Sequence, residues 1–115
     1  MAHMKVLICG GRDYNDWETF QEKMNMLGLE ITEIAHGDAR GADSLADDYA
    51  WLHGIPCTKF PADWKKHGKA AGIIRNATML KEFQPDMVVA FPGGRGTGDM
   101  INRAMKAGVR VIEVY

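Results

Sequence analysis

The stretch Pro92-Gly93-Gly94-Arg95-Gly96-Thr97-Gly98-Asp99 decides the expected fold, because of what stands on either side of it. It follows an apolar run over residues 87–91 and leads into residues 100–105, whose apolar positions recur at helical spacing. A buried strand, a glycine-rich turn and a helix start together form a cradle for a phosphate, since unpaired N–H groups of the first helical turn point at the anion. Thr97 adds a hydroxyl and Arg95 adds a fork of donors. The alternative is a tight turn that uses glycine only for its dihedral freedom.

The rest of the chain alternates strand and helix patterns in the same way. Short apolar runs predict strands at about residues 5–9, 31–35, 56–60, 87–91 and 109–114. Amphipathic spacing predicts helices from a cap at Asp16 to about Leu27, from a cap at Asp43 to before Gly54, from about Ala70 to before Pro85, and from about Asp99 to Ala107, with a polar loop over 61–69. This alternation predicts an α/β fold in which about five mostly parallel strands carry helices on both faces.

Length and composition indicate one domain over residues 4–115, preceded by Met1-Ala2-His3, which has the look of a cloning remnant. The formal net charge of −1 argues against a surface dedicated to nucleic acid. Because no apolar run is long enough to span a membrane and no signal peptide is seen, we expect a cytoplasmic protein without a membrane partner. Cys9 and Cys57 are expected to be buried reduced thiols, and the scattered histidines predict no metal site.

Three glycine-containing stretches follow predicted strands, at the sheet edge where parallel α/β folds bind ligands. The candidate ligand residues are Gly10, Gly11, Arg12 and Asp13 after the first strand, Gly37, Asp38, Arg40, Gly41 and Asp43 after the second, and Gly93, Gly94, Arg95, Gly96 and Thr97 after the fourth. Arginines suit phosphates, and carboxylates suit ribose hydroxyls or acid–base work. A phosphorylated ribose compound satisfies both. The competing structural roles are a surface pair for Arg12 and Asp13, a turn for Asp38 and a helix cap for Asp43.

These motifs, in this order, resemble the SLOG superfamily, named for DNA-processing protein A and the cytokinin-activating phosphoribohydrolases. Residues 92–97 resemble the Pro-Gly-Gly-x-Gly-Thr signature of the phosphoribohydrolases, and residues 37–43 are similar to the Gly-Ala-Arg-Gly-Ile-Asp stretch of the DNA-processing proteins. Arg75-Asn76 looks like a polar pair that both groups carry. The short length and the opening Gly-Gly-Arg-Asp look most like the small YspA-like branch, common in bacteria and phages.

The resemblance implies a Rossmann-like sheet, a nucleotide-derived ligand, and a homo-oligomer with sites near the interface. We expect no cofactor. The phosphoribohydrolases cleave the N-glycosidic bond of a nucleoside monophosphate with an arginine before strand four and a glutamate after Gly-Thr. By that resemblance Arg75 matches the arginine and Asn76 belongs to the ligand site. Asp99 could stand in for the first acid of an acidic pair, while Met100 replaces the second. Asp99 is one carbon shorter than a glutamate, so its carboxylate retreats by about a bond length, and this together with Met100 weakens the inference of hydrolysis.

Three functions follow as hypotheses. The first is a nucleotide-binding module that acts as a sensor or regulator. The second is a nucleoside 5′-monophosphate glycosidase that uses Asp99 to stabilise the oxocarbenium ion or activate water, with Arg75 holding the substrate. The third is single-stranded DNA binding through Trp64 and the lysines of residues 65–69, a combination that such grooves use.

Overall fold

A computed structural model describes residues 3–27 and 30–115, so Met1 and Ala2 of the expected cloning remnant lie outside the described residues. Its five strands form one sheet in the order β3-β2-β1-β4-β5, and every neighbouring pair is parallel. The strands are β1 (Met4–Cys9), β2 (Ile31–His36), β3 (Cys57–Lys59), β4 (Met87–Ala90) and β5 (Arg110–Glu113). This confirms the predicted parallel sheet, and each strand lies close to its expected position.

The strand order reverses between β1 and β4, and this reversal positions the site. From β1 the chain builds outward to β2 and β3, then returns to the other side of β1 to form β4 and β5. The connections after β1 and β4 therefore leave the sheet in opposite directions. Such a point opens a crevice beyond the carboxyl ends of the two central strands.

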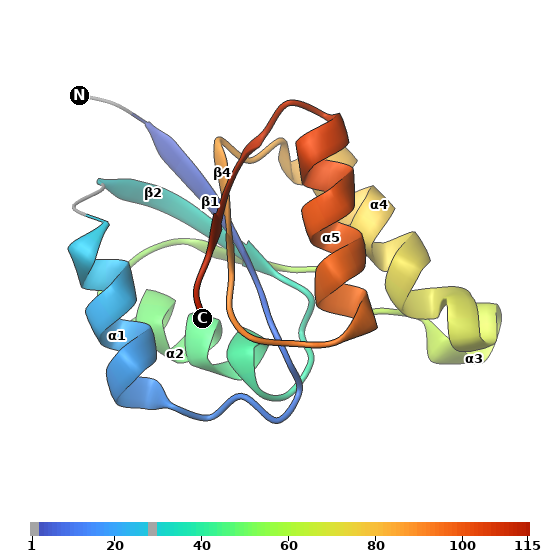
Figure 1. The fold of residues 1–115 in the computed structure, drawn as a ribbon, viewed down its shortest axis with the longest axis horizontal. Coiled ribbons are helices and arrows are strands. Elements are labelled where there is room, and N and C mark those ends of the chain that lie inside the picture. Colours follow the sequence, from blue (N-terminus) through green and yellow to red (C-terminus); the bar gives the residue numbers. More distant parts are fainter. Residues whose placement is uncertain (1–2, 28–29) are drawn as a thin grey trace.

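Helices cover both faces of the sheet, giving the three-layer Rossmann-like arrangement (Figure 1). On one face lie α1 (Trp17–Met26) and α2 (Ala42–Leu52), and on the other lie α4 (Ala71–Phe83) and α5 (Arg95–Lys106). Asp16 caps α1 as expected, with its side chain accepting the Thr19 N–H at 3.1 Å.

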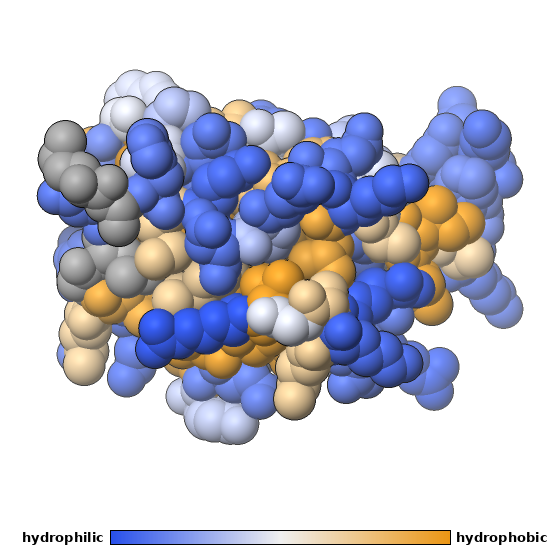
Figure 2. All heavy atoms as spheres, turned by 90° about the horizontal axis from the view of Figure 1, so that it is seen from above, coloured by the Kyte–Doolittle hydropathy of each residue, from blue (hydrophilic) through white to orange (hydrophobic). Residues whose placement is uncertain are grey.

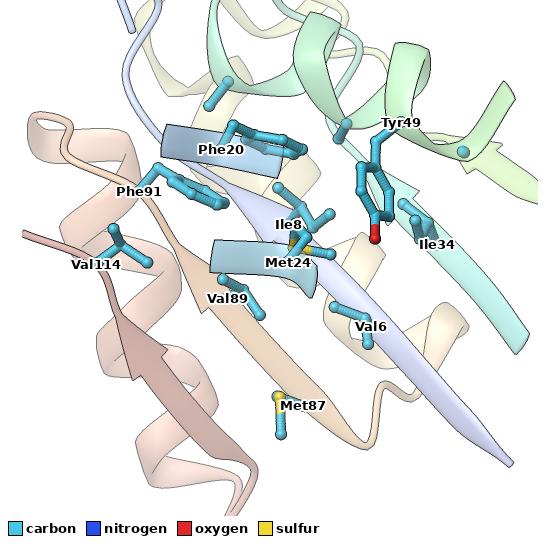
Figure 3. Close-up of a cluster of buried hydrophobic side chains, with 13 residues drawn as sticks. Val6, Ile8, Phe20, Met24, Ile34, Tyr49, Met87, Val89, Phe91 and Val114 are labelled. Carbon is cyan, nitrogen blue, oxygen red and sulfur yellow. The ribbon is translucent and has the colours of Figure 1, made fainter. Parts of the chain in front are cut away.

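The core divides into two layers because successive side chains of β1 point to opposite faces. Val6 and Ile8 face α1 and α2, while Leu7 and Cys9 face α4 and α5. Figure 3 shows the first layer, in which the rings of Phe20 and Phe91 lie 4.5 Å apart between centroids. Each such fully buried side chain contributes roughly 1.5–3 kcal/mol of transfer free energy. The packed core on both faces of the sheet thus fixes the positions of the carboxyl ends of β1 and β4.

Two helix starts differ from the prediction, and both differences bear on the site. Helix α5 begins at Arg95 rather than near Asp99, so the second half of the glycine-rich stretch is helical. Glycines disfavour a helix in sequence reasoning, but here the first turn is closed by the Gly98 N–H bonding to Gly94 O at 3.0 Å. For α2 the cap is Gly41, at φ 79°, and Asp43 lies inside the first turn.

The predicted polar loop over 61–69 also contains structure. A helical turn, α3 (Trp64–His67), is followed by a 3-10 turn, η1 (Gly68–Ala70). Asp63 explains α3, because its carboxylate accepts the Lys66 N–H at 3.1 Å as an N-cap. Figure 1 shows α3 projecting beyond the edge of the sheet, ahead of α4.

The outer surface is mixed in character. Figure 2 views the molecule from above and shows mainly hydrophilic side chains with smaller hydrophobic areas between them. Among the residues that the structure describes, none of the helices has the length and apolar character that a bilayer crossing requires.

Candidate functional site

A cleft of about 480 Å³ opens at the carboxyl edge of the central strands. Its walls come from the end of β1, the turn after β2, Trp64 of α3, one side of α4 and the first turn of α5. Beside it lies a smaller space of about 380 Å³, here called the side hollow, which is formed by the loops after β2 and β3. The two spaces share the residues Arg12, Gly37, Ala39, Trp64 and Arg75.

The structure brings most of the predicted site residues to these two spaces. Eleven of them line the cleft: Gly10, Gly11, Arg12, Gly37, Asp43, Arg75, Asn76, Gly94, Arg95, Gly96 and Thr97. Asp38 and Arg40 line the side hollow. Asp13, Gly41, Gly93 and Asp99 line neither space.

Three of the predicted phosphate-binding glycines serve chain packing. The Gly11 N–H donates to Pro92 O at 2.9 Å, and Gly11 O accepts from Ala42 N at 3.1 Å, so this loop joins β4 to the start of α2. A methyl group on Gly10 would lie 2.5 Å from the Ala42 Cβ, and one on Gly93 would lie 2.6 Å from Gly11 N. Glycine is needed here because the two loops cross with no room for a side chain.

The first turn of α5 is different. Its N-cap, Gly94, makes no side-chain capping bond, and the turn holds no acidic residue. A methyl group on Gly94 or Gly96 would meet nothing within 4 Å. The residues of this turn line the cleft, with open space at the two glycines. Such a turn attracts anions through its unpaired donors and the helix dipole.

Arg75 reaches from α4 to the turn after β2. Its Nη1 donates to Gly37 O at 2.5 Å and to Phe60 O at 3.4 Å, and its Nε donates to Asn76 Oδ1 at 3.0 Å. Burial lowers the pKa of Arg75, while the nearby carboxylate of Asp43 raises it again in part. An arginine with an ordinary pKa above 12 stays charged after such a shift. Arg75 is thus a held cation at the centre of the site.

Asp43 is the buried acid of the cleft, with 6% of its surface exposed. Its Oδ2 accepts the Ala39 N–H at 3.2 Å, which ties α2 to the loop before it. Burial raises the pKa of the Asp43 carboxyl, and the Ala39 N–H, His36 and Arg75 offset part of that rise. The pKa of the neighbouring Cys9 thiol is raised to about 12, chiefly by burial. Cys9 therefore lines the cleft as an uncharged thiol.

Asp99 lies away from the cleft, between α4 and α5. Its Oδ2 accepts from Asn76 Nδ2 at 3.1 Å and from Arg103 Nε at 2.8 Å. Asn76 Nδ2 also donates to Gly96 O at 3.0 Å, so the buried Asn76 joins the two helices. The carboxylate is engaged in this linkage, and the catalytic role predicted for Asp99 gains no support from its position.

The remaining predicted residues form the rim. Arg40 Nη2 and Asp13 Oδ1 pair at 3.3 Å with side chains 74% and 95% exposed, a geometry that contributes little to stability. Asp38 adopts a left-handed conformation at φ 55°, which suits the turn that was its alternative role. Arg12 lies over the Trp64 ring, 5.0 Å from its centroid, rather than pairing with Asp13 among the described ion pairs.

Sequence reasoning left part of the cleft wall out of the nucleotide site, although it named Lys69 for the DNA-binding hypothesis. Cys9, Lys69, Gly72, Ile73 and Met79 line it as well. Ile73 is one of the apolar positions whose spacing predicts this helix, and it is 46% exposed. Apolar spacing alone cannot distinguish a residue that faces the core from one that faces a cleft beside it, because both lie on nearly the same side of the helix.

Sequence reasoning also missed a cluster of His36, Asp47 and Cys57, whose potential ligand atoms lie within 4.8 Å of one another. The Asp38 N–H donates to His36 Nδ1 at 2.9 Å, which assigns the ring proton to Nε2, 3.0 Å from Asp47 Oδ1. A metal on Nε2 would move that proton to Nδ1, where it would face the Asp38 N–H. Burial, with a smaller effect of Asp47, raises the pKa of Cys57 to about 11, and this half-buried residue is therefore a thiol. We interpret the cluster as a support for the turn after β2.

Comparison with known proteins agrees with this arrangement. A model of the YspA, cpYpsA-related SLOG family matches residues 4–67, which include β1 to β3 and the site residues Arg12, Gly37 and Asp43. The chain is also 38% identical over 119 aligned residues to "Gene 61 protein" of Mycobacterium phage D29, an alignment that covers 94% of each chain. The chain therefore belongs to the YspA, cpYpsA-related SLOG family.

Proposed function

We propose that the cleft binds a nucleotide or a nucleotide-derived ligand with a phosphorylated ribose, and that the protein acts as a sensor or regulatory module. One observation carries this proposal. The charged residues that line the cleft are four cations, Arg12, Lys69, Arg75 and Arg95, and one carboxylate, Asp43. On a chain with a formal net charge of −1, this concentration of positive charge beside an uncapped helix start favours a phosphate.

The size of the site supports a small ligand. Cavities of about 300–1,000 Å³ hold typical small molecules, and the cleft of about 480 Å³ lies within that range. The side hollow adds about 380 Å³ and shares Arg12, Trp64 and Arg75 with the cleft. A phosphate at the start of α5 would leave the rest of the cleft, up to α3, for a sugar and a base.

Trp64 is the aromatic residue suited to a base. Its ring is 48% exposed, it borders both spaces, and it already carries the Arg12 guanidinium. Aromatic stacking on a base contributes about 1–3 kcal/mol where it has been measured by alanine substitution. The base is therefore proposed to stack on Trp64, with Arg12 moving aside or lying over it.

Binding without fast turnover is favoured over a glycosidase that uses Asp99. Hydrolysis of an N-glycosidic bond needs an acid or base within hydrogen-bond reach of the reacting groups. Asp99 is held by Asn76 and Arg103 and does not line the cleft. The family similarity by itself points only to a nucleotide-related ligand.

The test is a thermal-shift screen against nucleoside mono-, di- and triphosphates, ADP-ribose and cyclic nucleotides, with every hit incubated and analysed for free base by chromatography. A ligand at one hundred times its dissociation constant stabilises the fold by about 2.7 kcal/mol, which such a screen detects. We expect a hit that is recovered intact. Release of free base would mean that the protein is an enzyme rather than a sensor. The absence of any hit would refute the proposed nucleotide binding.

Two variants sharpen this screen. Trp64→Ala is expected to weaken binding about tenfold or more through loss of the stacking surface. Trp51→Ala removes another exposed tryptophan, 82% exposed near the end of α2, which lines neither the cleft nor the side hollow. Equal losses in both variants would contradict a specific role for Trp64. Binding that depends steeply on salt and prefers single-stranded DNA would instead favour the nucleic-acid hypothesis.

A further inference from the structure

Asp43 is the single carboxylate that lines the cleft among the described residues, and it lies beside the cationic groups proposed for a phosphate. A carboxylate there opposes the binding of an anion, so its presence calls for a different ligand group. We propose that Asp43 accepts a hydrogen bond from a ribose hydroxyl, and that the cleft therefore selects ribonucleotide-type ligands over their deoxyribose counterparts. This inference rests on the proposed nucleotide-binding function and specifies the sugar.

One oxygen of Asp43 is already used. Oδ2 accepts the Ala39 N–H at 3.2 Å, while Oδ1 takes part in none of the side-chain hydrogen bonds found in the described part of the chain. No buried side-chain oxygen or nitrogen of the described residues lacks a partner. Oδ1 must therefore reach accessible surface, and the surface that Asp43 lines is the cleft.

A purely structural role does not account for this arrangement. Helix α2 is capped by Gly41, and the Ala39 bond needs one acceptor oxygen, which an asparagine supplies equally well. The cost of burying the negative charge is offset only in part, by the Ala39 and Gly37 N–H groups, His36 and Arg75, so the fold alone does not account for a carboxylate here. Arg75 does not neutralise that charge directly, because no ion pair within 4.0 Å joins it to Asp43 in the described structure.

The neighbouring groups suit a sugar that carries a phosphate. Asp43 and Arg75 both face the space beside Gly37, since a methyl group on Gly37 would lie 3.0 Å from Asp43 Oδ2 and would also strike the Arg75 guanidinium. An acceptor and a cationic donor thus face the same space beside one glycine. A ribose hydroxyl can donate to Oδ1, whereas a deoxyribose carbon leaves that oxygen desolvated and unpaired.

The expected discrimination is large because the site is polar and nearly buried. Hydrogen bonds to charged groups are among the strongest in proteins, and a site built for a hydroxyl rejects the analogue that lacks it. We expect the ribose ligand to bind about 10- to 100-fold more tightly than the matching deoxy ligand.

The experiment measures dissociation constants by calorimetry for the ribonucleoside mono-, di- and triphosphates, the cyclic nucleotides and ADP-ribose of the thermal-shift screen, then for the 2′-deoxy and 3′-deoxy forms of each nucleotide that binds. Wild type is compared with Asp43→Asn, which keeps an acceptor for Ala39, and with Asp48→Asn. The control Asp48 is an exposed carboxylate on the same helix that lines neither space. We expect wild type and Asp48→Asn to prefer ribose at least tenfold over at least one deoxy form, and Asp43→Asn to lose most of that preference.

The outcomes separate the two proposals. If wild type binds nucleotides and their deoxy forms equally, the Asp43 inference is wrong while the proposed function stands. If the preference exists but survives in Asp43→Asn, another group reads the hydroxyl and the inference is again wrong. If none of the probes binds, both proposals fail. The wild-type comparison is decisive even if Asp43→Asn does not fold.

Discussion

Gly93 and Gly96 belong to the same glycine-rich stretch, yet they occupy opposite surroundings. A methyl group on Gly93 would lie 2.6 Å from Gly11 N and 3.0 Å from the Gly10 carbonyl carbon. A methyl group on Gly96 would meet nothing within 4 Å. The first glycine permits two loops to cross, and the second leaves space in front of a helix start. A motif that looks uniform in sequence thus divides into a packing half and an open half.

The role of a glycine at a site therefore depends on what occupies the space where a side chain would stand. In the packing half, neighbouring protein atoms occupy that space, so chain packing alone explains the glycine and no ligand is needed. In the open half no described atom fills it and φ is not positive, so the fold alone gives no reason for glycine. The open glycines that also line the cleft, Gly94 and Gly96, are the ones that point to a bound partner.

The largest effect is expected for Gly93→Ala. Its methyl group would press on main-chain atoms of the β1 loop, which cannot move aside as a flexible side chain can. Overpacking of this kind costs roughly 1–3 kcal/mol or more. Urea unfolding followed by circular dichroism should show a lower midpoint with little change in slope. A variant as stable as wild type would remove the distinction between the two halves.

The next effect separates binding from stability. Gly96→Ala should leave the fold intact, and even stabilise α5 by up to about 0.5–1 kcal/mol, because alanine is a better helix former. If a phosphate occupies the open space, the same change should weaken ligand binding about tenfold or more. The matched control is Gly98→Ala, an equally open helical glycine that does not line the cleft. Titration of all three proteins with the best nucleotide from the screen provides the measurement, and unchanged affinity in Gly96→Ala would contradict a phosphate at that position.

Gly37→Ala tests a case between the two halves. Its methyl group would meet the guanidinium of Arg75, the far end of a flexible side chain, so the stability cost should stay below about 1 kcal/mol. Displacing Arg75 from Gly37 O should nevertheless reduce ligand affinity about tenfold. Thermal melting and calorimetry on the same samples separate these effects. A large loss of stability would place Gly37 with Gly93 instead.

The smallest effect concerns Asp43, on the other side of Gly37. Burial raises the pKa of Asp43, so over the range between its unfolded and folded pKa values the folded state binds more protons than the unfolded state. The unfolding free energy of wild type therefore falls as pH rises through that range. The charged or titratable groups that face Asp43 are His36, Cys9 and Arg75, and they are retained in the variant.

Asp43→Asn removes this buried charge and should be more stable than wild type at pH 7, on the order of 1 kcal/mol. The advantage should shrink as pH is lowered towards the ordinary carboxyl pKa near 4. Urea unfolding of both proteins between pH 4 and pH 8 measures the difference. A variant less stable than wild type at pH 7 would mean that Asp43 contributes through its charge to folding rather than to a ligand.

The sheet could be predicted because its strands are buried on both faces and read as apolar runs. The start of α5 could not be predicted, because glycine destabilises the interior of a helix but much less its first turn. The N-cap of α2 could not be predicted either, because Asp43 and Gly41 both suit helix starts. Only the hydrogen bond from the Ala42 N–H to Gly11 O decides between them.

The site was predictable where residues follow strands directly, as Gly11, Arg12 and Gly37 do. Arg75 came from resemblance, since nothing in the spacing of α4 marks it among other helical arginines. The position of Asp99 was unpredictable for a different reason. An acidic residue one turn into a helix can face a cleft or a neighbouring helix, and here Asn76 and Arg103 draw it to the helix side. The spacing of residues in the sequence does not show which of these directions the Asp99 side chain takes.

The place of β1 between β2 and β4 has a consequence for how the chain acquires its shape during synthesis. Its partner on one side, β2, is made soon afterwards, but β4 follows only after α2, β3, α3 and α4. Until then β1 presents an open edge of main-chain N–H and C=O groups, the kind of edge that recruits other strands. The late pairing also makes the fold rich in distant contacts, which slows its formation. Nascent chains are therefore vulnerable to misassembly until β4 has paired, and a ligand that needs the β1 and β4 loops together can protect only the finished domain.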